Sequence, residues 1–330
     1  MDLDRFPRVA LAHLPTPLEP LDTLSALLGG PRIWVKRDDC TGLSTGGNKA
    51  RKLEFLLADA REQGADTVIT AGATQSNHAR QTAAACAKLG MRCAIVLEDR
   101  AGSDDPAFTR NGNVLLDHLH GAEVSVVPGG TDLALATEDV ARRVRDRGRT
   151  PYLIPVGGSN AIGGLGYALA AAEVRAQCRA LELELDQIVL ATGSGGTQAG
   201  LLAGLARTGP RIPVLGFTVK LGAAEQHAVV EALTAELDAL LDDGAGVDRR
   251  SITVDDGQVG PGYGVPTAAM AEALRLLARC EGLLLDPVYS GKAFAGLIAG
   301  VRDGRFSTAR NVLFWHTGGS AALFGYANLL

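Results

Sequence analysis

The 330-residue sequence contains no block of basic residues and no unbroken apolar run of membrane length. Its formal net charge is −5, and no Lys/Arg cluster suited to a phosphate backbone is present, so we expect no nucleic-acid partner. Two stretches of about twenty residues, 151–172 and 187–206, lack charged residues, but Gly, Ser, Asn or Thr interrupt both. We therefore expect buried strand–loop–helix units there and no membrane span.

Cysteine is also scarce, and the five residues are scattered without any C-x-x-C pair. This pattern favours free thiols in a reducing cytoplasm over a disulfide framework. The short acidic start, residues 1–10, does not resemble a signal peptide, so we predict a cytoplasmic protein. His118 and His120, with Asp117, fall on different faces of a helix, so the sequence predicts no metal site.

Strand-like runs alternate with helical patterns almost throughout, and many of the 41 glycines follow the strands. A short strand is predicted at 33–36. A first set of four strands is predicted at 67–70, 93–97, 124–127 and 152–156, and a second set at 187–192, 214–219, 283–286 and 312–315. Helices are predicted from residue 49 and at 79–89, 113–120, 132–147, 161–178, 198–205, 223–241, 267–280 and 291–301. This alternation predicts an α/β fold with two domains, each a parallel sheet flanked by helices. We predict a small domain of residues 51–160 and a large domain of residues 1–50 and 161–330.

A lysine lies at the junction of a Gly-rich loop and an amphipathic helix, in the run Gly46-Gly47-Asn48-Lys49. In one interpretation, Lys49 is one of three exposed cations on the first helical turn, together with Arg51 and Lys52. In the other, Lys49 binds a carbonyl cofactor covalently as a Schiff base. The local sequence leaves both interpretations open, although Arg51 and Lys52 are expected on the helix surface in either case.

The run Gly193-Ser194-Gly195-Gly196-Thr197 follows a predicted strand and opens a helix. Backbone N–H groups and the helix dipole at such a junction bind phosphate, although a tight turn without a ligand is the alternative. A dinucleotide fingerprint would place glycine at position 198, where Gln198 stands, and a P-loop would require a lysine that is absent. The loop therefore suits a single phosphate group.

Polar residues also follow other predicted strands, at 75–78, 286–292 and 316–320. Gln75-Ser76-Asn77-His78 offers donors for a carboxylate at the carboxyl end of a strand, where α/β sheets place ligands. Helix capping is the alternative for this run and for 286–292, where Ser290 is the natural N-cap. One cofactor connects a reactive lysine, a single-phosphate loop and polar strand ends, namely pyridoxal 5′-phosphate (PLP).

Seven motifs together resemble the D-cysteine desulfhydrase and 1-aminocyclopropane-1-carboxylate (ACC) deaminase group, which belongs to the tryptophan synthase β-like PLP enzymes of fold type II. The resemblance spans nearly the whole chain. The motifs lie at 36–39, 46–54, 75–78, 193–197, 261–264, 286–289 and 316–319. The resemblance implies that the large domain binds PLP, that the substrate is a small amino acid and that the protein is a homodimer.

The resemblance also implies a role for each matching residue. Lys49 would bind the cofactor and move the Cα proton, Tyr289 would stack on the cofactor ring, and Ser290 would face the ring nitrogen. The implied catalytic residues are Lys49, Ser76 and Tyr289. The implied cofactor-binding residues are Lys49, Asn77, Gly193, Ser194, Gly195, Gly196, Thr197, Tyr289 and Ser290. The implied substrate-binding residues are Gln75, Ser76, Asn77, His78, Tyr263 and Thr317.

Two positions bear on the reaction. Ser290 stands where ACC deaminases have glutamate, and Thr317 stands where they typically have leucine. A neutral hydroxyl at the ring nitrogen suits β-elimination better than opening of a cyclopropane. Three runs, 40–47, 74–81 and 112–120, resemble L-cysteate sulfo-lyases, so the sequence favours elimination of sulfite from L-cysteate. The alternatives are D-cysteine desulfhydrase, then ACC deaminase, and, in another class, a non-catalytic nucleotide-binding α/β protein.

Overall fold

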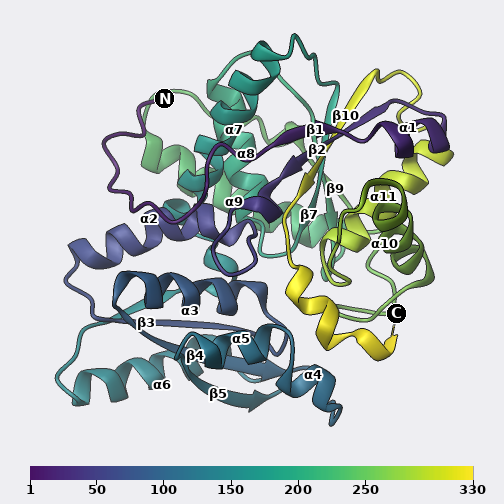
Figure 1. Ribbon diagram of the computed structural model, residues 1–330. Coiled ribbons are helices and arrows are strands. Elements are labelled where there is room, and N and C mark those ends of the chain that lie inside the picture. Colours follow the sequence, from purple (N-terminus) through teal and green to yellow (C-terminus); the bar gives the residue numbers. More distant parts are fainter. Residues whose placement is uncertain (330) are drawn as a thin grey trace.

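The computed structural model describes residues 1–329 and contains two sheets flanked by helices (Figure 1). The larger sheet has the order β1-β2-β10-β7-β8-β9, and its neighbouring strands run parallel except for β1 and β2. Its strands are β1 (Leu18–Pro20), β2 (Arg32–Arg37), β7 (Gln187–Thr192), β8 (Val214–Thr218), β9 (Ile252–Asp255) and β10 (Asn311–His316). The smaller sheet has the order β5-β4-β3-β6 and is parallel throughout. Its strands are β3 (Thr67–Ala73), β4 (Arg92–Asp99), β5 (Glu123–Pro128) and β6 (Pro151–Ile154).

Helices cover both faces of the larger sheet because successive side chains of its strands point to opposite faces. In β10, Val312 and Phe314 join one apolar core, and Leu313 and Trp315 join the other. The first core is covered by α1 (Asp22–Leu28), α10 (Ala268–Glu281) and α11 (Ser290–Arg302). The second core is covered by α7 (Ala161–Ala180), α8 (Gly196–Arg207) and α9 (Ala223–Leu241).

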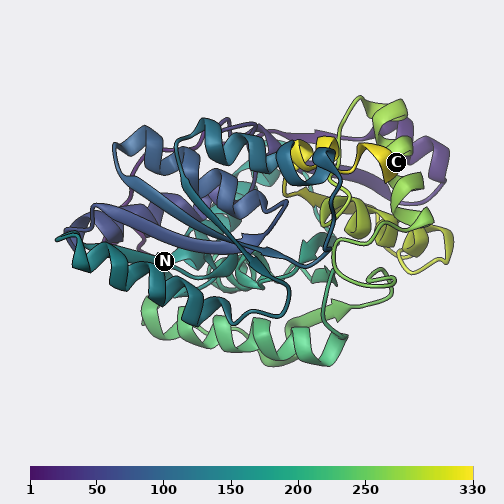
Figure 2. The ribbon, with the colours of Figure 1, turned by 90° about the horizontal axis from the view of Figure 1, so that it is seen from below.

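The smaller sheet is covered in the same way, and one of its helices also touches the larger unit. The helices on one face are α2 (Lys49–Glu62), α3 (Asn77–Leu89) and α5 (Asn113–Leu119), and α6 (Leu133–Asp146) covers the other. In α2, Leu53 and Leu56 pack into the core of the smaller sheet, whereas Phe55 packs against Leu165 of α7. Helix α2 therefore lies between the two units, as Figure 1 shows. In Figure 2, seen from below, the smaller unit stands in front of the larger one.

Short elements complete the described chain. Helix α4 (Pro106–Arg110) lies against the 3-10 helix η4 (Ser320–Gly325) near the C-terminus. The other 3-10 helices are η1 (Asp38–Cys40), η2 (Val156–Gly158), η3 (Arg249–Ser251) and η5 (Ala327–Leu329). Within residues 1–329, no helix is both long and apolar enough to cross a membrane. All five cysteines are free, and no group of metal-ligating side chains is found in the same range.

The predicted alternation of strands and helices is confirmed, with two kinds of error. Residues 283–286 do not form a strand, because Leu283 and Leu285 pack against the first core without pairing to a neighbouring backbone. The short elements β1, β9, α1 and α4 were not predicted. The four strands of the smaller sheet lie within residues 51–160 and the other six lie outside it. We propose the two-domain division on that ground.

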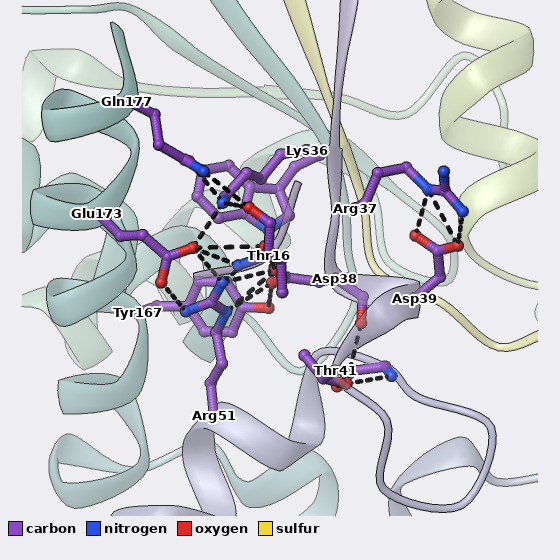
Figure 3. A network of polar contacts seen from close by, with 12 residues as sticks. Thr16, Lys36, Arg37, Asp38, Asp39, Thr41, Arg51, Tyr167, Glu173 and Gln177 are labelled. Carbon is purple, nitrogen blue, oxygen red and sulfur yellow. Dashed lines mark hydrogen bonds and ion pairs between the residues drawn. The ribbon is translucent and has the colours of Figure 1, made fainter. Parts of the chain in front are cut away.

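Arg51 and Lys52 are not surface cations, and this prediction was wrong. Both side chains are about 1% exposed, because α2 is covered on two sides. The guanidinium of Arg51 donates to both carboxylate oxygens of Asp38 at 2.8–3.0 Å and to both of Glu173 at 2.9 Å (Figure 3). The buried charge of Arg51 is thus paired with two carboxylates, which offsets the cost of removing it from water.

One further ion pair and a hydrogen bond from a tyrosine complete this buried ion network, which we define as Lys36, Asp38, Arg51 and Glu173. The ammonium of Lys36 donates to Glu173 at 2.5 Å, and Asp38 accepts from the Tyr167 hydroxyl at 2.6 Å. The carbonyl of Asp38 also accepts the N–H of Gly47 at 3.0 Å, two residues before Lys49. Although burial alone would raise the pKa of Asp38, the adjacent Arg51 holds it below its usual value. The network thus joins β2, α2 and α7 and fixes the loop before Lys49.

We expect Arg51→Met to lower the free energy of unfolding by about 3–5 kcal/mol, because the change leaves Asp38 and Glu173 buried without a guanidinium. Asp38→Asn, which keeps the shape of the side chain, should have an effect of the same sign. The matched control is Arg302→Met, which breaks a pair with Glu272 that is about half exposed, and we expect a change of about 0–1 kcal/mol. Urea denaturation measures all three, and equal shifts for the network and control variants would contradict the prediction.

Candidate active site

A cavity of about 300 Å³ lies where strands of both sheets end. Its walls include Ala73 at the end of β3, Gly157 beyond β6, Thr192 at the end of β7 and Thr317 beyond β10. Carboxyl ends of parallel strands are the usual place for ligands in α/β proteins. Eleven of the residues singled out by the sequence line this cavity: Lys49, Ser76, Asn77, His78, Gly193, Ser194, Gly195, Thr197, Tyr263, Tyr289 and Thr317.

Lys49 is the first residue of α2 and is partly buried in the cavity wall. Its backbone N–H donates to the side-chain oxygen of Gln81 at 2.9 Å, which fixes the start of the helix. Burial lowers the pKa of the Lys49 amine to about 8, although the charge of Asp286 opposes this shift. A larger fraction of the amine is therefore neutral, and hence nucleophilic, than for an exposed lysine.

The Gly-rich loop is hydrogen-bonded to the residue that precedes this lysine. The Asn48 amide donates to the hydroxyl of Thr197 at 3.0 Å, so the two motifs that the sequence separates by about 150 residues are hydrogen-bonded neighbours. Among the described residues, the N–H groups of Ser194 and Gly195 have no hydrogen-bond partner. A Cβ atom at Gly196 would lie 2.6 Å from the Ser159 hydroxyl, so only glycine allows this close approach. The loop presents free donors at a helix N-terminus, as a phosphate requires.

Lys52 lies beside this loop, and the sequence analysis missed it. Its ammonium donates to the Gly157 carbonyl and to the Ser159 hydroxyl, each at 3.0 Å, and a Cβ at Gly196 would be 2.9 Å from it. No carboxylate pairs with it within residues 1–329, and burial, with the nearby Lys49, holds its pKa well below the usual value. A buried cation with only neutral partners fits a site for an anion. Lys52 follows Lys49 by three residues, and this spacing places both side chains on one side of the helix.

The polar run at the start of α3 combines capping with access to the cavity. The hydroxyl of Ser76 accepts the N–H of Ala79 at 3.1 Å, so the capping interpretation is confirmed for this residue. Nε2 of His78 bonds to the Thr70 hydroxyl at 2.8 Å, whereas its buried Nδ1 has no partner among residues 1–329. Burial, with the charges of Lys49 and Lys52, keeps the pKa of His78 far below its usual value. The imidazole is therefore neutral and has one ring nitrogen free for a ligand.

Two tyrosines form a wall of the cavity next to the Gly-rich loop. The hydroxyls of Tyr263 and Tyr289 bond to each other, and their rings meet edge to face with centroids 5.9 Å apart. A Cβ at Gly193 would lie 3.4 Å from the ring of Tyr289, which places this ring against the loop. An aromatic face next to a single-phosphate loop fits a flat cofactor ring.

Three predicted site residues do not line the cavity. The Gln75 amide donates to the carbonyls of Phe108 and Asn111, so its side chain holds the 108–113 segment, and the prediction of substrate contact is not supported for it. Gly196 contributes its N–H to the Ser159 hydroxyl at 3.3 Å. The sequence analysis assigned no role to Arg100 or Lys220, although both line the cavity.

Ser290 is the third predicted site residue that does not line the cavity. Its hydroxyl donates to the buried carboxylate of Asp286 at 2.6 Å. Ser290 is also not the N-cap of α11. Tyr289 has that position, and the carboxylate of Asp286 accepts the N–H groups of Val288, Tyr289 and Ser290. Asp286 therefore satisfies the helix start that was predicted for the serine. A contact between Ser290 and a cofactor ring stays a prediction.

The donors in this cavity fit PLP. An amine of lowered pKa suits its aldehyde, the free N–H groups with Lys52 suit one phosphate, and Tyr289 offers a ring for stacking. The unpartnered nitrogen of His78 provides a further donor or acceptor at the same site. No carboxylate lines the cavity to oppose an anionic ligand.

Comparisons with known proteins agree with this chemistry. Residues 9–318 match the family model described as pyridoxal-phosphate dependent enzyme. D-cysteine desulfhydrase of Klebsiella pneumoniae (strain 342) is 48% identical over 325 residues, which cover 98% of each chain. D-cysteine desulfhydrase of Salmonella newport (strain SL254) is 48% identical over 98% of this chain and 97% of its own. The solved structure of an ACC deaminase homologue has a TM-score of 0.89 at 39% identity and covers 99% of this chain and 96% of its own.

We expect covalent capture of PLP by the cofactor-free protein to accelerate with pH, with a midpoint of about 8 set by Lys49. Only the neutral amine attacks the aldehyde, and the lowered pKa moves its deprotonation below that of an exposed lysine, which titrates near 10.4. Stopped-flow absorbance after mixing with PLP measures the rate, and Lys49→Ala, which should show no capture, is the control. A midpoint above pH 10 would contradict the assigned environment of Lys49.

We expect Lys52→Met to weaken the affinity for PLP by about 10- to 100-fold, because one charge-assisted hydrogen bond to the phosphate is lost. Covalent capture should persist, since Lys49 remains. Titration of the cofactor-free protein measures the dissociation constant, and Lys88→Met, at an exposed lysine of α3, is the matched control. Inorganic phosphate should compete with PLP in the parent protein and less well in the variant. An unchanged affinity for both ligands would rule out a phosphate contact.

Proposed function

The chain belongs to the pyridoxal-phosphate dependent enzymes, and from that premise we propose that it is a carbon–sulfur lyase that converts D-cysteine to pyruvate, hydrogen sulfide and ammonia. Two D-cysteine desulfhydrases that are 48% identical over almost the whole chain support this substrate. The observation that carries the proposal is the Lys49 amine, with its pKa lowered to about 8, next to Asn48, whose side-chain amide donates to Thr197 of the Gly-rich loop.

The relatives change the order of the substrates that the sequence favoured. L-cysteate was the first choice, but no relative named here is an L-cysteate sulfo-lyase, whereas the alternative, D-cysteine, is the substrate in their names. ACC remains the third choice, because Ser290 and Thr317 stand where glutamate and leucine were expected. The family match gives no support to the non-catalytic alternative. A homodimer and a cytoplasmic location remain predictions.

Binding is assigned to residues on three sides of the cavity. The N–H groups of Ser194 and Gly195, with the ammonium of Lys52, hold the phosphate. The α3 N-terminus at Ser76 and Asn77 holds the substrate carboxylate, because it supplies donors and a favourable dipole. Tyr289 packs on one side of the ring. These residues orient the substrate with its Cα near the amine of Lys49.

PLP, when bound, supplies an electron-withdrawing ring that delocalises the charge developing at the substrate Cα. The amine of Lys49 would accept the proton from the substrate Cα. Its lowered pKa keeps a useful fraction of the amine neutral near pH 7–8. The linked hydroxyls of Tyr263 and Tyr289 offer a proton for the departing sulfur. Water then releases ammonia and leaves pyruvate.

We expect the protein to release sulfide and pyruvate from D-cysteine in equal amounts, and Lys49→Ala to lower kcat by at least about 1,000-fold because the proton acceptor is lost. Lys88→Ala, which changes an exposed lysine of α3, should leave kcat unchanged. Sulfide, sulfite and 2-oxobutyrate are measured after incubation with D-cysteine, L-cysteate and ACC, respectively. Turnover of ACC without sulfide release from D-cysteine would overturn the proposed substrate, and full turnover by Lys49→Ala would overturn the proposed mechanism.

A further inference from the structure

The side chain of Asn77 lines the cavity from the first turn of α3, and one atom of its amide is already engaged. Its oxygen accepts a hydrogen bond from the side-chain amide of Asn113 at 2.9 Å. Its nitrogen has no hydrogen-bond partner within residues 1–329 and lies near Gly319, where an added Cβ would be 2.6 Å from it. Which atom Asn77 offers to a ligand therefore depends on the orientation of this amide.

Asn113 fixes that orientation, because its own amide lies between a group that can only donate and a group that can only accept. Asn113 begins α5, and its side chain is fully buried. Nε of Arg80 donates to its oxygen at 3.1 Å, and its nitrogen donates to the carbonyl of Gln75 at 3.1 Å. A guanidinium has no acceptor, and a carbonyl has no donor. The nitrogen of Asn113 must therefore face Asn77, and the atom of Asn77 that it meets must be the oxygen.

The residues that hold Asn113 are themselves fixed. The side-chain oxygen of Gln75 accepts the backbone N–H of Asn113 at 3.0 Å, which sets the position of the first turn of α5. Arg80 is buried, and its Nη1 donates to the carbonyl of Gly46 at 3.1 Å. The same guanidinium thus fixes the orientation of Asn113 and the loop that leads to Lys49.

We propose that Asn113 is a positioning residue that acts through Asn77 and directs the N–H donor of the Asn77 amide toward the ligand. The ligand atom at this position is then an oxygen that accepts a hydrogen bond. Both molecules proposed for the cavity supply such an oxygen, since PLP has one on its ring and the substrate has a carboxylate. The proposal rests on the proposed function, which places both molecules here.

Asn113→Asp reverses the amide of Asn77 with almost no change of shape. A carboxylate cannot donate, so Asn77 must turn its nitrogen toward position 113 and its oxygen toward the cavity. Arg80, which has no carboxylate in hydrogen-bond contact within residues 1–329, gains an ion pair that offsets the lost bond to the Gln75 carbonyl. We therefore expect the urea midpoint of this variant to match that of the parent protein.

Two binding measurements test the proposal. The cofactor-free protein is titrated with PLP, and the holoenzyme is titrated with propionate, a carboxylate without a reactive amine. We expect Asn113→Asp to weaken the binding of PLP or of propionate by about 10- to 100-fold, because an oxygen then faces an oxygen. A weaker affinity for PLP with a shifted visible band of the bound cofactor assigns the ring oxygen. A weaker affinity for propionate with an unshifted band assigns the carboxylate.

A double-mutant cycle separates the orientation of Asn77 from the added charge. In an Asn77→Ala background, Asn113→Asp should change either affinity by less than about twofold, because the residue through which it acts is gone. Asn111→Asp adds the same charge at an exposed position two residues earlier, and this matched control should leave both affinities unchanged. If Asn113→Asp does not fold, Asn113→Ala takes its place in the cycle and should weaken binding by about 3- to 10-fold.

Neither titration requires turnover, so the role of Asn113 and the proposed function fail separately. Unchanged affinities for both PLP and propionate in the variant would overturn the role of Asn113. An equal loss of affinity in the Asn77→Ala background would overturn it as well, since the charge would then act directly. A parent protein that binds PLP and releases no sulfide from D-cysteine would overturn the proposed function, while the two titrations still decide the role of Asn113.

Discussion

The paired burial of Arg51 and Asp38 is the constraint on which the site depends. Both side chains are removed from water, and both belong to segments next to the cavity. Asp38 directly follows β2 and also accepts the N–H of Gly47, while Arg51 lies in the first turn of α2, two residues after Lys49. A buried ion pair adds little net stability compared with apolar packing, but a partly broken one is costly. The pair therefore selects one register of α2 against β2 and α7, and the position of Lys49 follows from that register.

Positive charge is concentrated on the other side of the same helix turn. Lys52 is removed from water and Lys49 is partly buried, and neither has a carboxylate in hydrogen-bond contact within residues 1–329. Burial lowers both pKa values, and repulsion from Lys49 lowers the pKa of Lys52 further. Burial and the charges of both lysines also suppress protonation of His78. A group that carries a phosphate would relieve this repulsion. The same desolvation that makes Lys49 a nucleophile therefore makes the neighbouring loop a site for an anion.

Sequence patterns identified the parts of this site that are continuous along the chain. The Gly193–Thr197 loop, the Lys49 junction and the α3 start could be found because glycine spacing and polar strand ends have local physical causes. Capping roles were harder to assign. Ser290 was chosen as the natural N-cap of its helix, yet Asp286, four residues earlier, supplies the carboxylate that accepts three N–H groups. Several polar residues compete for one helix start, and only the backbone path decides between them.

The sequence by itself determined the alternation of strands and helices, the single-phosphate loop and the candidate lysine, since each depends on residues that are neighbours in the chain. Tertiary structure decided which charges are buried. The sequence predicted Arg51 and Lys52 as surface cations because the sequence of a single helical turn does not indicate whether a second unit packs against it. They are buried because α7 and the smaller sheet cover α2 from two sides. The sequence did not indicate Arg100 as a cavity residue for the same reason. Its place at the cavity depends on where β4 ends relative to Tyr263, which is more than 160 residues away.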